Sequence, residues 1–217
     1  MRVVIAGGHG KIALRLARRL AERGDQAVGL VRNPGHQADV AAAGGQAVVC
    51  DLEGASAEEV ARVLDGADAA VFAAGAGPGS GAARKDTVDR AASVLLAEAA
   101  ERAGLRRFVQ ISSMGAGAPP AAGSDEVWAA YIAAKTAAEA DLRGRDLDWT
   151  ILRPGGLTDE EGQGRVLLAP PPVARGTVPR DDVAAVVVAL LDAPATVGRT
   201  LELVRGEVPI AEAVRAL

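Results

Sequence analysis

The sequence predicts an α/β protein in which helices cover both faces of a doubly wound parallel sheet. Short apolar runs alternate with segments of helical periodicity from the first residue onward, which is typical of parallel strands joined by crossover helices. A glycine cluster at residues 7–10 separates the first apolar run from the first helical segment. No repeat or linker divides the 217 residues, so we expect a single domain, 1–217, with a small substrate-side elaboration at about 155–180.

Seven apolar runs predict the strands. They are short and nearly continuous, which indicates burial on both faces of the sheet. We expect strands at residues 3–6, 27–31, 47–50, 69–73, 108–111, 149–152 and 200–204.

The segments between the strands carry helix signals. Apolar residues recur at helical spacing from Ile12 to Leu20, and Ser56 with Glu59 forms a capping-box pattern. Asp181 or Asp182 is expected to cap the last long helix. We expect helices at about 12–20, 56–64, 85–103, 127–142 and 181–191, and a weaker one that ends at 43.

Charge and residue usage exclude several classes of function. The chain has 24 basic and 28 acidic residues and a net charge of −4, so neither nucleic acid nor an anionic membrane is expected as a partner. The single cysteine, Cys50, excludes an internal disulfide, and with only two histidines no Cys/His metal site is expected. No signal peptide is apparent, and the longest apolar run, Val183–Leu191, is too short to span a bilayer. We expect a cytoplasmic monomer or homodimer that acts on a small molecule.

The composition makes some residue types informative. There are 48 alanines and 26 glycines but only five aromatic residues, and 21 arginines but only three lysines. This skew is typical of a GC-rich coding sequence. A lysine or a tyrosine in such a chain therefore marks a position that deserves a chemical explanation.

The glycine cluster has the pattern of a dinucleotide-binding loop. In Gly7-x-x-Gly10-x-x-Ala13, the glycines permit a tight turn and a close approach of the backbone to a pyrophosphate. The helix that follows presents free N–H groups and a positive dipole end to that anion. Its position between the first strand and the first helix makes the motif specific.

The end of the second strand indicates which dinucleotide is bound. An NAD site usually has an acidic residue there, but this strand ends Leu30-Val31-Arg32-Asn33. Arg32 can pair with a 2′-phosphate, which favours NADP(H) over NAD(H). With 21 arginines, a solvated arginine at a strand end is the alternative. Asp51 can accept from the adenine amino group or merely cap a loop, and residues 73–75 are small enough for the cofactor to cross.

A second motif indicates proton transfer. The fifth strand ends in Ser112 and Ser113, and the next helix carries Tyr131, the only tyrosine, four residues before Lys135. That spacing puts both side chains on one helix face. A nearby ammonium lowers the pKa of a tyrosine, and a serine can polarise a carbonyl. The alternative is that Tyr131 fills the core and Lys135 is solvated.

These motifs together resemble the atypical short-chain dehydrogenase/reductase superfamily. The resemblance is specific to the small NAD(P)H-binding proteins that are similar to bacterial sugar-epimerase-like reductases and biliverdin reductase B. The matching stretches are residues 6–12, 31–34, 108–113, 131–135, 148–158 and 178–184.

The resemblance implies a Rossmann fold of about seven parallel strands and assigns roles to several residues. It implies that Ser113, Tyr131 and Lys135 form a Ser-Tyr-Lys catalytic set and that residues 154–157 line the nicotinamide. The cofactor contacts that we expect are Gly7, Gly8, His9, Gly10, Lys11, Ile12, Arg32, Asn33, Asp51, Leu52, Ala73, Ala74, Gly75, Ser112, Lys135, Pro154, Gly155, Gly156 and Leu157.

Three functional hypotheses follow. The first is an NADP-dependent oxidoreductase that acts on a small carbonyl, quinone or similar acceptor, with Tyr131 as proton donor. The second is a non-catalytic NADP(H)-binding redox regulator, suggested by the short substrate region. The third is an epimerase or isomerase that retains its cofactor. The intact Tyr131–Lys135 pair favours the first.

Overall fold

The computed structural model describes residues 1–77, 79–119 and 123–217. A central sheet of nine strands runs through it in the order β11-β8-β10-β6-β5-β4-β1-β2-β3. The seven strands from β10 to β3 are parallel. Their bounds are β1 Arg2–Ala6, β2 Gln26–Val31, β3 Gln46–Val49, β4 Ala69–Phe72, β5 Arg107–Ile111, β6 Asp148–Pro154 and β10 Arg199–Arg205. The expected α/β class and all seven expected strands are confirmed.

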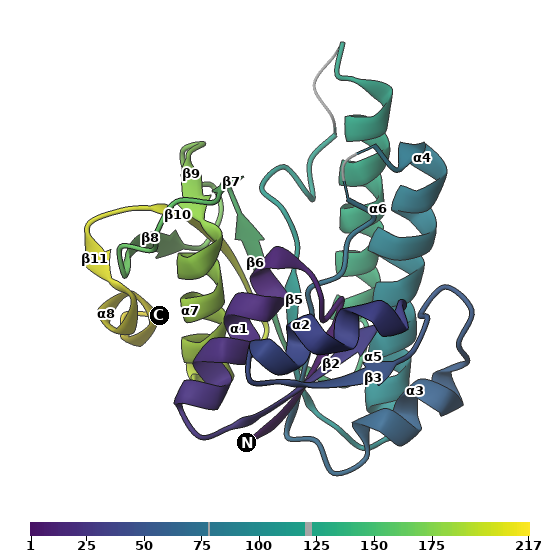
Figure 1. Cartoon of the computed structure of the whole chain (residues 1–217). Coiled ribbons are helices and arrows are strands. Elements are labelled where there is room, and N and C mark those ends of the chain that lie inside the picture. Colours follow the sequence, from purple (N-terminus) through teal and green to yellow (C-terminus); the bar gives the residue numbers. More distant parts are fainter. Residues whose placement is uncertain (78, 120–122) are drawn as a thin grey trace.

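Helices cover both faces of this sheet (Figure 1). On one face α1 (Lys11–Glu22) packs beside α7 (Arg180–Leu191), and their apolar sides share a buried core with β1, β5 and β10. On the other face lie α3 (Ala57–Leu64), α5 (Ala92–Arg102) and α6 (Glu126–Arg143), over a second core that includes Phe72 and Phe108. The shorter helices are η1 (Pro34–His36), α2 (Gln37–Ala42), α4 (Gly81–Arg84), η3 (Pro194–Thr196) and α8 (Ile210–Arg215).

Two helices begin with a side-chain cap, and one helix lacks the cap that the sequence predicts. The Ser56–Glu59 capping box is present at α3, and Asp125 caps α6 by accepting from the Trp128 N–H at 3.0 Å. The expected cap of α7 by Asp181 or Asp182 is wrong. Asp181 pairs with Arg19, and the buried Asp182 accepts from two backbone N–H groups of the preceding loop, at residues 163 and 164.

The long helix expected at 85–103 is present but not uniform. It begins at α4, and a π-helical segment, η2 (Lys85–Ala91), leads into α5. A π-turn rotates the side chains that follow it relative to a regular helix, and such turns occur frequently at functional sites.

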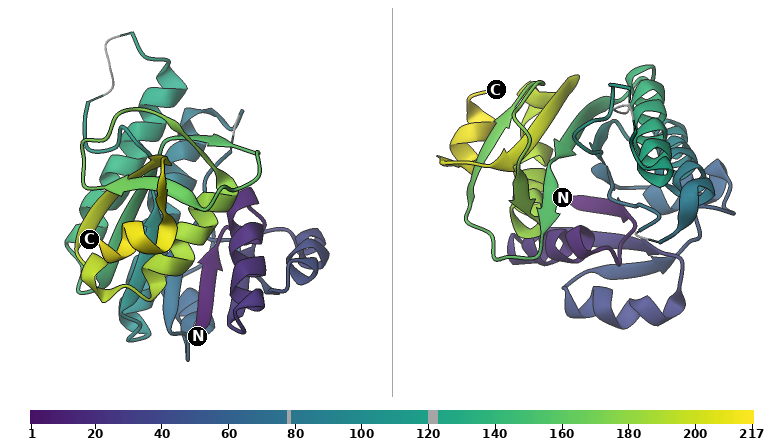
Figure 2. Two further views of the ribbon diagram at one scale, coloured as in Figure 1. Left: turned by 90° about the vertical axis from the view of Figure 1, so that its left-hand side faces the viewer. Right: turned by 90° about the horizontal axis from the view of Figure 1, so that it is seen from above.

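Residues 155–180, where a small substrate-side elaboration was expected, contain three further strands. Residues 166–168 belong to a strand, β8 (Arg165–Ala169), which pairs antiparallel with β10. The two-residue strand β11 (Val208–Pro209) extends this edge, and α8 packs against it. A separate parallel pair is formed by β7 (Gly156–Thr158) and β9 (Thr177–Pro179). Figure 2 shows these C-terminal segments gathered beside the β10 edge of the sheet.

The strand order places the site. The chain passes from β1 outward to β3 and then returns to β4, on the other side of β1. In such sheets a crevice opens at this reversal, beyond the carboxyl ends of the strands. The loops after β1, β2, β3 and β4 all meet there, and those after β5 and β6 lie next to them.

Candidate active site

In the loop after β1, the backbone lies so close to β2 and to the loop after β4 that a Cβ atom would clash. Gly7 has φ +75°, and a Cβ on it would lie 2.6 Å from Ala74 Cα. A Cβ on Gly8 would lie 2.5 Å from Gly29 Cα in β2. Glycine is therefore required at both positions, and the loop stays thin between β2 and β4.

The first turn of α1 is suited to an anion. Its N-cap is Gly10, and within the described part of the chain no side chain caps the helix and no acidic residue lies in its first turn. The backbone N–H groups there point out of the helix, with the positive end of the dipole behind them. The bare helix start and the tight glycine loop fit the pyrophosphate of a dinucleotide.

A pocket of about 300 Å³ extends from this loop across β2 and β4. Nine of the predicted cofactor contacts line it: Gly7, His9, Gly10, Arg32, Asp51, Leu52, Ala73, Ala74 and Gly75. The structure also places Glu53, Arg84 and His36 in this pocket. None of these three residues is expected there from the sequence.

Four other predicted contacts have local roles here. Gly8 packs on Gly29, and Ile12 packs against the α1–α7 core. Asn33 accepts from the Gly35 N–H at 2.9 Å. Lys11 donates to Asp159 at 2.6 Å. Their contact with a cofactor stays a prediction.

The half-buried Cys50 also lines this pocket. Burial raises the pKa of its thiol, so the sulfur is held in the unreactive protonated form.

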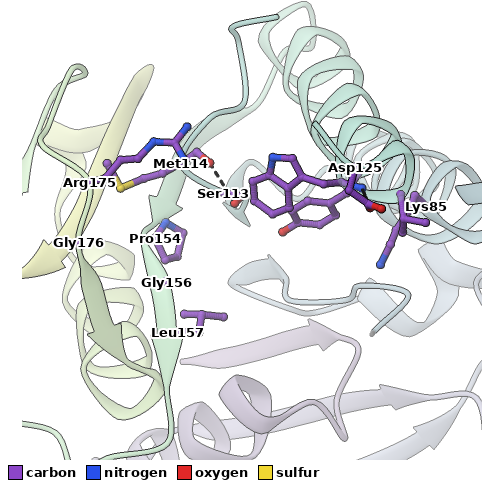
Figure 3. Close-up of a pocket in the computed structure, with 13 residues that line it drawn as sticks. Lys85, Ser113, Met114, Asp125, Pro154, Gly156, Leu157, Arg175 and Gly176 are labelled. Carbon is purple, nitrogen blue, oxygen red and sulfur yellow. Dashed lines mark hydrogen bonds between the residues drawn. The ribbon is translucent and has the colours of Figure 1, made fainter. Parts of the chain in front are cut away.

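A second cavity, of about 640 Å³, opens beyond β5 and β6 (Figure 3). Figure 3 shows Pro154, Gly156 and Leu157 along one wall, with Lys85 and Asp125 projecting from the helices opposite. The remaining lining residues are Ser113, Met114, Val127, Trp128, Tyr131, Gly155, Arg175 and Gly176. The predicted residues Ser113, Tyr131 and 154–157 are thus brought together around one space.

Lys135 lies behind Tyr131 rather than in the solvent. Its side chain is 4% exposed, and Nζ lies 5.7 Å from the centre of the Tyr131 ring. Nζ also donates to the backbone carbonyl of Ile111 at 3.3 Å. The alternative in which Lys135 is a solvated helix residue is therefore wrong.

Two residues of the π-helical segment complete this group. Asp89 is buried, and its Oδ1 lies 3.3 Å from Lys135 Nζ. Its Oδ2 accepts from the Ala76 N–H at 3.1 Å, so Asp89 links the Tyr131 cavity to the loop that borders the cofactor pocket. Lys85 is 8% exposed, and its Nζ lies 5.4 Å from the centre of the Tyr131 ring.

Asp89 and Lys85 were not predicted from the sequence. The scarcity of lysine could have found Lys85, because two of the three lysines flank the single tyrosine.

The two serines after β5 have different surroundings. Ser113 lines the cavity and donates to the carbonyl of Met114 at 3.3 Å, a long contact that a substrate oxygen can replace (Figure 3). Ser112 is buried, and its hydroxyl donates to Glu139 at 2.6 Å. Its backbone N–H donates to the Leu152 carbonyl at 2.7 Å, and its contact with a cofactor stays a prediction.

Glu139 is the centre of a buried ionic network under this wall. Arg153 donates to both of its carboxylate oxygens, at 2.9 and 2.5 Å, and Arg143 donates at 2.8 Å. Burial opposes ionisation of Glu139, but hydrogen bonds from Arg153 and Ser112 outweigh it and keep its pKa below the usual value. The network joins α6 to β6 and fixes the ends of β5 and β6 around the cavity.

Where the chain turns out of β6, the backbone is closely packed. A Cβ on Gly155 would lie 2.3 Å from the Gly176 carbonyl oxygen, and the Gly156 N–H donates to that oxygen at 2.8 Å. This contact holds residues 154–157 in the cavity wall, where a nicotinamide is expected.

Comparison with known proteins agrees with this geometry. The NAD(P)H-binding family matches residues 7–194, which include the glycine loop, the Tyr131 cavity and α7. The chain belongs to this family. A curated relative from Bacillus subtilis, named as the uncharacterized sugar epimerase YhfK, is 38% identical over the full length of both chains.

Two solved structures share the whole fold. A putative NAD-dependent epimerase/dehydratase from Bacillus halodurans superposes with a TM-score of 0.91 and is 34% identical, with both chains fully covered. ChuY, an anaerobillin reductase from Escherichia coli O157:H7, has a TM-score of 0.79 and 26% identity, with 96% of this chain and 98% of that chain covered. The resemblance drawn from the sequence is confirmed.

Two absences, of membrane-spanning helices and of metal-binding clusters, are found in residues 1–77, 79–119 and 123–217, which the structure describes. None of their helices is both long and apolar enough to cross a membrane. Nor do three or more of their His, Cys, Asp and Glu side chains lie together where they could hold a metal ion.

Proposed function

We propose that the protein is an NADP-dependent reductase of the atypical short-chain dehydrogenase/reductase type, acting on a small carbonyl, quinone or similar acceptor. One observation carries the proposal. Tyr131 and Ser113 line the same cavity as residues 154–157, with the Lys135 ammonium behind the tyrosine ring. This brings a proton donor and a hydroxyl to the wall where the nicotinamide is expected.

Each residue then has a role in reduction of a carbonyl. The glycine loop and residues 154–157 would hold NADPH, which would supply a hydride for the carbonyl carbon. Tyr131 donates its hydroxyl proton to the carbonyl oxygen and recovers a proton from solvent, so that an alcohol and NADP⁺ result. Ser113 donates a hydrogen bond to the same oxygen, and the Lys135 ammonium stabilises the tyrosinate left after proton transfer.

The character of the cavity supports an acceptor with apolar surface. Val127, Trp128 and Leu157 are among the large hydrophobic side chains that remain exposed, and all three line this cavity. A planar quinone or aromatic carbonyl would cover such surface on binding. We also propose a cytoplasmic location, because the single cysteine cannot form an internal disulfide.

The test is NADPH consumption with wild type and Tyr131→Phe against quinones, aldehydes, ketones and free flavins. The variant keeps the ring and removes only the hydroxyl. We expect turnover with one acceptor class, a loss of at least about 100-fold in Tyr131→Phe, and an NADPH Kd within about twofold of wild type. Equal turnover in both proteins would rule out Tyr131 as the proton donor.

The names of two relatives favour a second candidate, an epimerase that retains its nicotinamide. That function predicts cofactor carried through purification and slow exchange with added NADPH. Absorbance and mass spectrometry of the purified protein would decide, and a cofactor-free preparation with fast exchange would exclude it.

A further inference from the structure

A carboxylate occupies the part of the cofactor pocket where a phosphate is expected. Glu53 follows β3 and lies in the pocket beside Arg32. Its Oε2 accepts from Arg32 Nη1 at 3.3 Å and from Arg84 Nη2 at 2.5 Å, and its Oε1 accepts from Thr87 at 2.7 Å.

The two arginines reach this point from opposite sides of the crevice. Arg32 directly follows β2, whereas Arg84 is the last residue of the short helix α4 after β4. Both line the pocket, and both guanidinium groups point at one acidic oxygen. The planar donor fork of arginine matches the geometry of a phosphate, so two converging guanidinium groups are well suited to bind a phosphate dianion.

Glu53 is ionised but held loosely enough to be displaced. Hydrogen bonds from Arg84 and Thr87 keep the pKa of its carboxyl below the usual value, so it carries a negative charge at neutral pH. The side chains of Arg32 and Arg84 are 59% and 36% exposed. Ion pairs this open to solvent contribute little stability and rearrange readily.

We propose that Arg84 is a second ligand for the 2′-phosphate of NADP, and that Glu53 occupies the phosphate position until the cofactor arrives. The phosphate and Glu53 then compete for the same two guanidinium groups. A phosphate carries more negative charge than a carboxylate and offers three oxygens, so it displaces Glu53. This inference deepens the proposed function, since it names the residues that select the cofactor.

The competition sets the cofactor preference. Binding of NADP has to break the contacts of Glu53, so Glu53 lowers the affinity for the phosphorylated cofactor. A cofactor without the phosphate leaves Glu53 in place, where its carboxylate can accept from a ribose hydroxyl. Arg84 therefore increases discrimination in favour of NADP, and Glu53 reduces it.

The test uses two nucleotides that differ only in the 2′-phosphate, adenosine 2′,5′-bisphosphate and adenosine 5′-monophosphate. Their Kd values are measured by calorimetry with wild type, Arg84→Gln and Glu53→Gln. We expect Arg84→Gln to weaken binding of the bisphosphate about tenfold or more and binding of the monophosphate less than twofold. We expect Glu53→Gln to strengthen binding of the bisphosphate several-fold without strengthening binding of the monophosphate.

Arg90→Gln is the matched control. Arg90 lies on the same helical stretch, but it pairs with Asp86 on the surface and does not line the pocket. Neither Kd should change in this variant. Circular dichroism of all variants checks that each is folded.

Several outcomes would overturn the proposal. An unchanged ratio of the two Kd values in Arg84→Gln would remove Arg84 from the phosphate site. Weaker bisphosphate binding in Glu53→Gln would show that Glu53 orders the arginines rather than competing. Failure of wild type to bind either nucleotide would refute the site itself. If the ratio of the two Kd values changes in Arg84→Gln as expected but wild type shows no reductase turnover, the proposed reaction is refuted and this inference stands.

Discussion

Asp89 and Lys135 form a buried ion pair, with Oδ1 and Nζ 3.3 Å apart and side-chain exposures of 1% and 4%. The pair lies between the two cavities, because Asp89 also accepts from the Ala76 N–H beside the cofactor pocket. Its position behind Tyr131 makes Asp89 a positioning residue for the lysine. Burying both charges is costly, and each needs the other to offset the loss of water.

The first prediction concerns Asp89→Asn. An asparagine can still accept from the Ala76 N–H, but the Lys135 ammonium loses its counter-charge. We expect the unfolding free energy to fall by about 3–5 kcal/mol, as when one partner of a buried pair is removed. Urea denaturation measures the change. Turnover should fall as well, because Lys135 is no longer held behind Tyr131.

The control for this variant is Asp86→Asn. Asp86 lies on the same π-helical segment but is exposed and pairs with Arg90 on the surface, so little change is expected. The double variant Asp89→Asn/Lys135→Met should recover part of the lost stability, since it removes both charges. A double variant less stable than Asp89→Asn alone would contradict the pairing.

The second prediction is a pH dependence that arises from Glu139. Its pKa is lowered in the folded protein, so its contribution to stability is present above its ordinary pKa of 4.5 and is lost as the pH falls through the folded value. Glu139→Gln lacks this contribution and leaves Arg153 buried without its counter-charge, so we expect a loss of about 3–5 kcal/mol at pH 7.

The difference in unfolding free energy between wild type and Glu139→Gln should then decrease as the pH falls below about 4.5. Urea unfolding at pH 7, 5 and 3.5 measures it. Glu98→Gln, which removes a surface pair with Arg102, should be close to wild type throughout. A constant gap from pH 7 to 3.5 would show that Glu139 does not carry the dependence.

Much of the fold could be predicted from the sequence because the parallel strands, apart from the edge strand β3, are largely buried on both faces. Such strands can be recognised as apolar runs without knowing which strands they pair with. The strand β8 was not expected, because its large apolar residues, 166–168, form only a short run in the sequence. The strand β11 has only two residues and depends on pairing with β8.

The site was predicted where rare residues or fixed spacings carried the signal. The glycine loop is a local motif, and Tyr131 and Lys135 are scarce residues on one helix face. Asp89 was missed because a π-turn cannot be recognised from spacing. Glu139 and Glu53 were missed because their partners, Arg153 and Arg84, are distant in sequence and meet them only after folding.

The third prediction concerns the thin glycine loop. A Cβ at residue 8 would lie 2.5 Å from Gly29 Cα and 2.7 Å from Gly29 C, and a backbone cannot move aside as a flexible side chain can. We expect Gly8→Ala to lower the unfolding free energy by about 1–3 kcal/mol and to weaken NADPH binding, because β1 and β2 must separate. Thermal unfolding and fluorescence titration measure both effects.

Gly54→Ala is the comparison for this variant. Gly54 lies near the same pocket, but a Cβ there would meet nothing within 4 Å and its φ is not positive. Stability should stay within about 0.5 kcal/mol of wild type. If Gly8→Ala behaved in the same way, the close approach of the loop to β2 would not be required.

The last prediction concerns Lys85, the second ammonium beside Tyr131. Its Nζ donates to the Gly77 carbonyl at 2.9 Å. A nearly buried cation on the wall of the cavity can stabilise negative charge that develops on a substrate oxygen. Lys85→Met keeps the length of the side chain and removes the charge. We expect kcat/KM to fall about tenfold or more, with the NADPH Kd within twofold of wild type. Lys85→Arg should recover part of the activity if charge is what matters. If Lys85→Met instead kept full activity and only lost thermal stability, Lys85 would serve to hold the loop at Gly77 and not to assist the reaction.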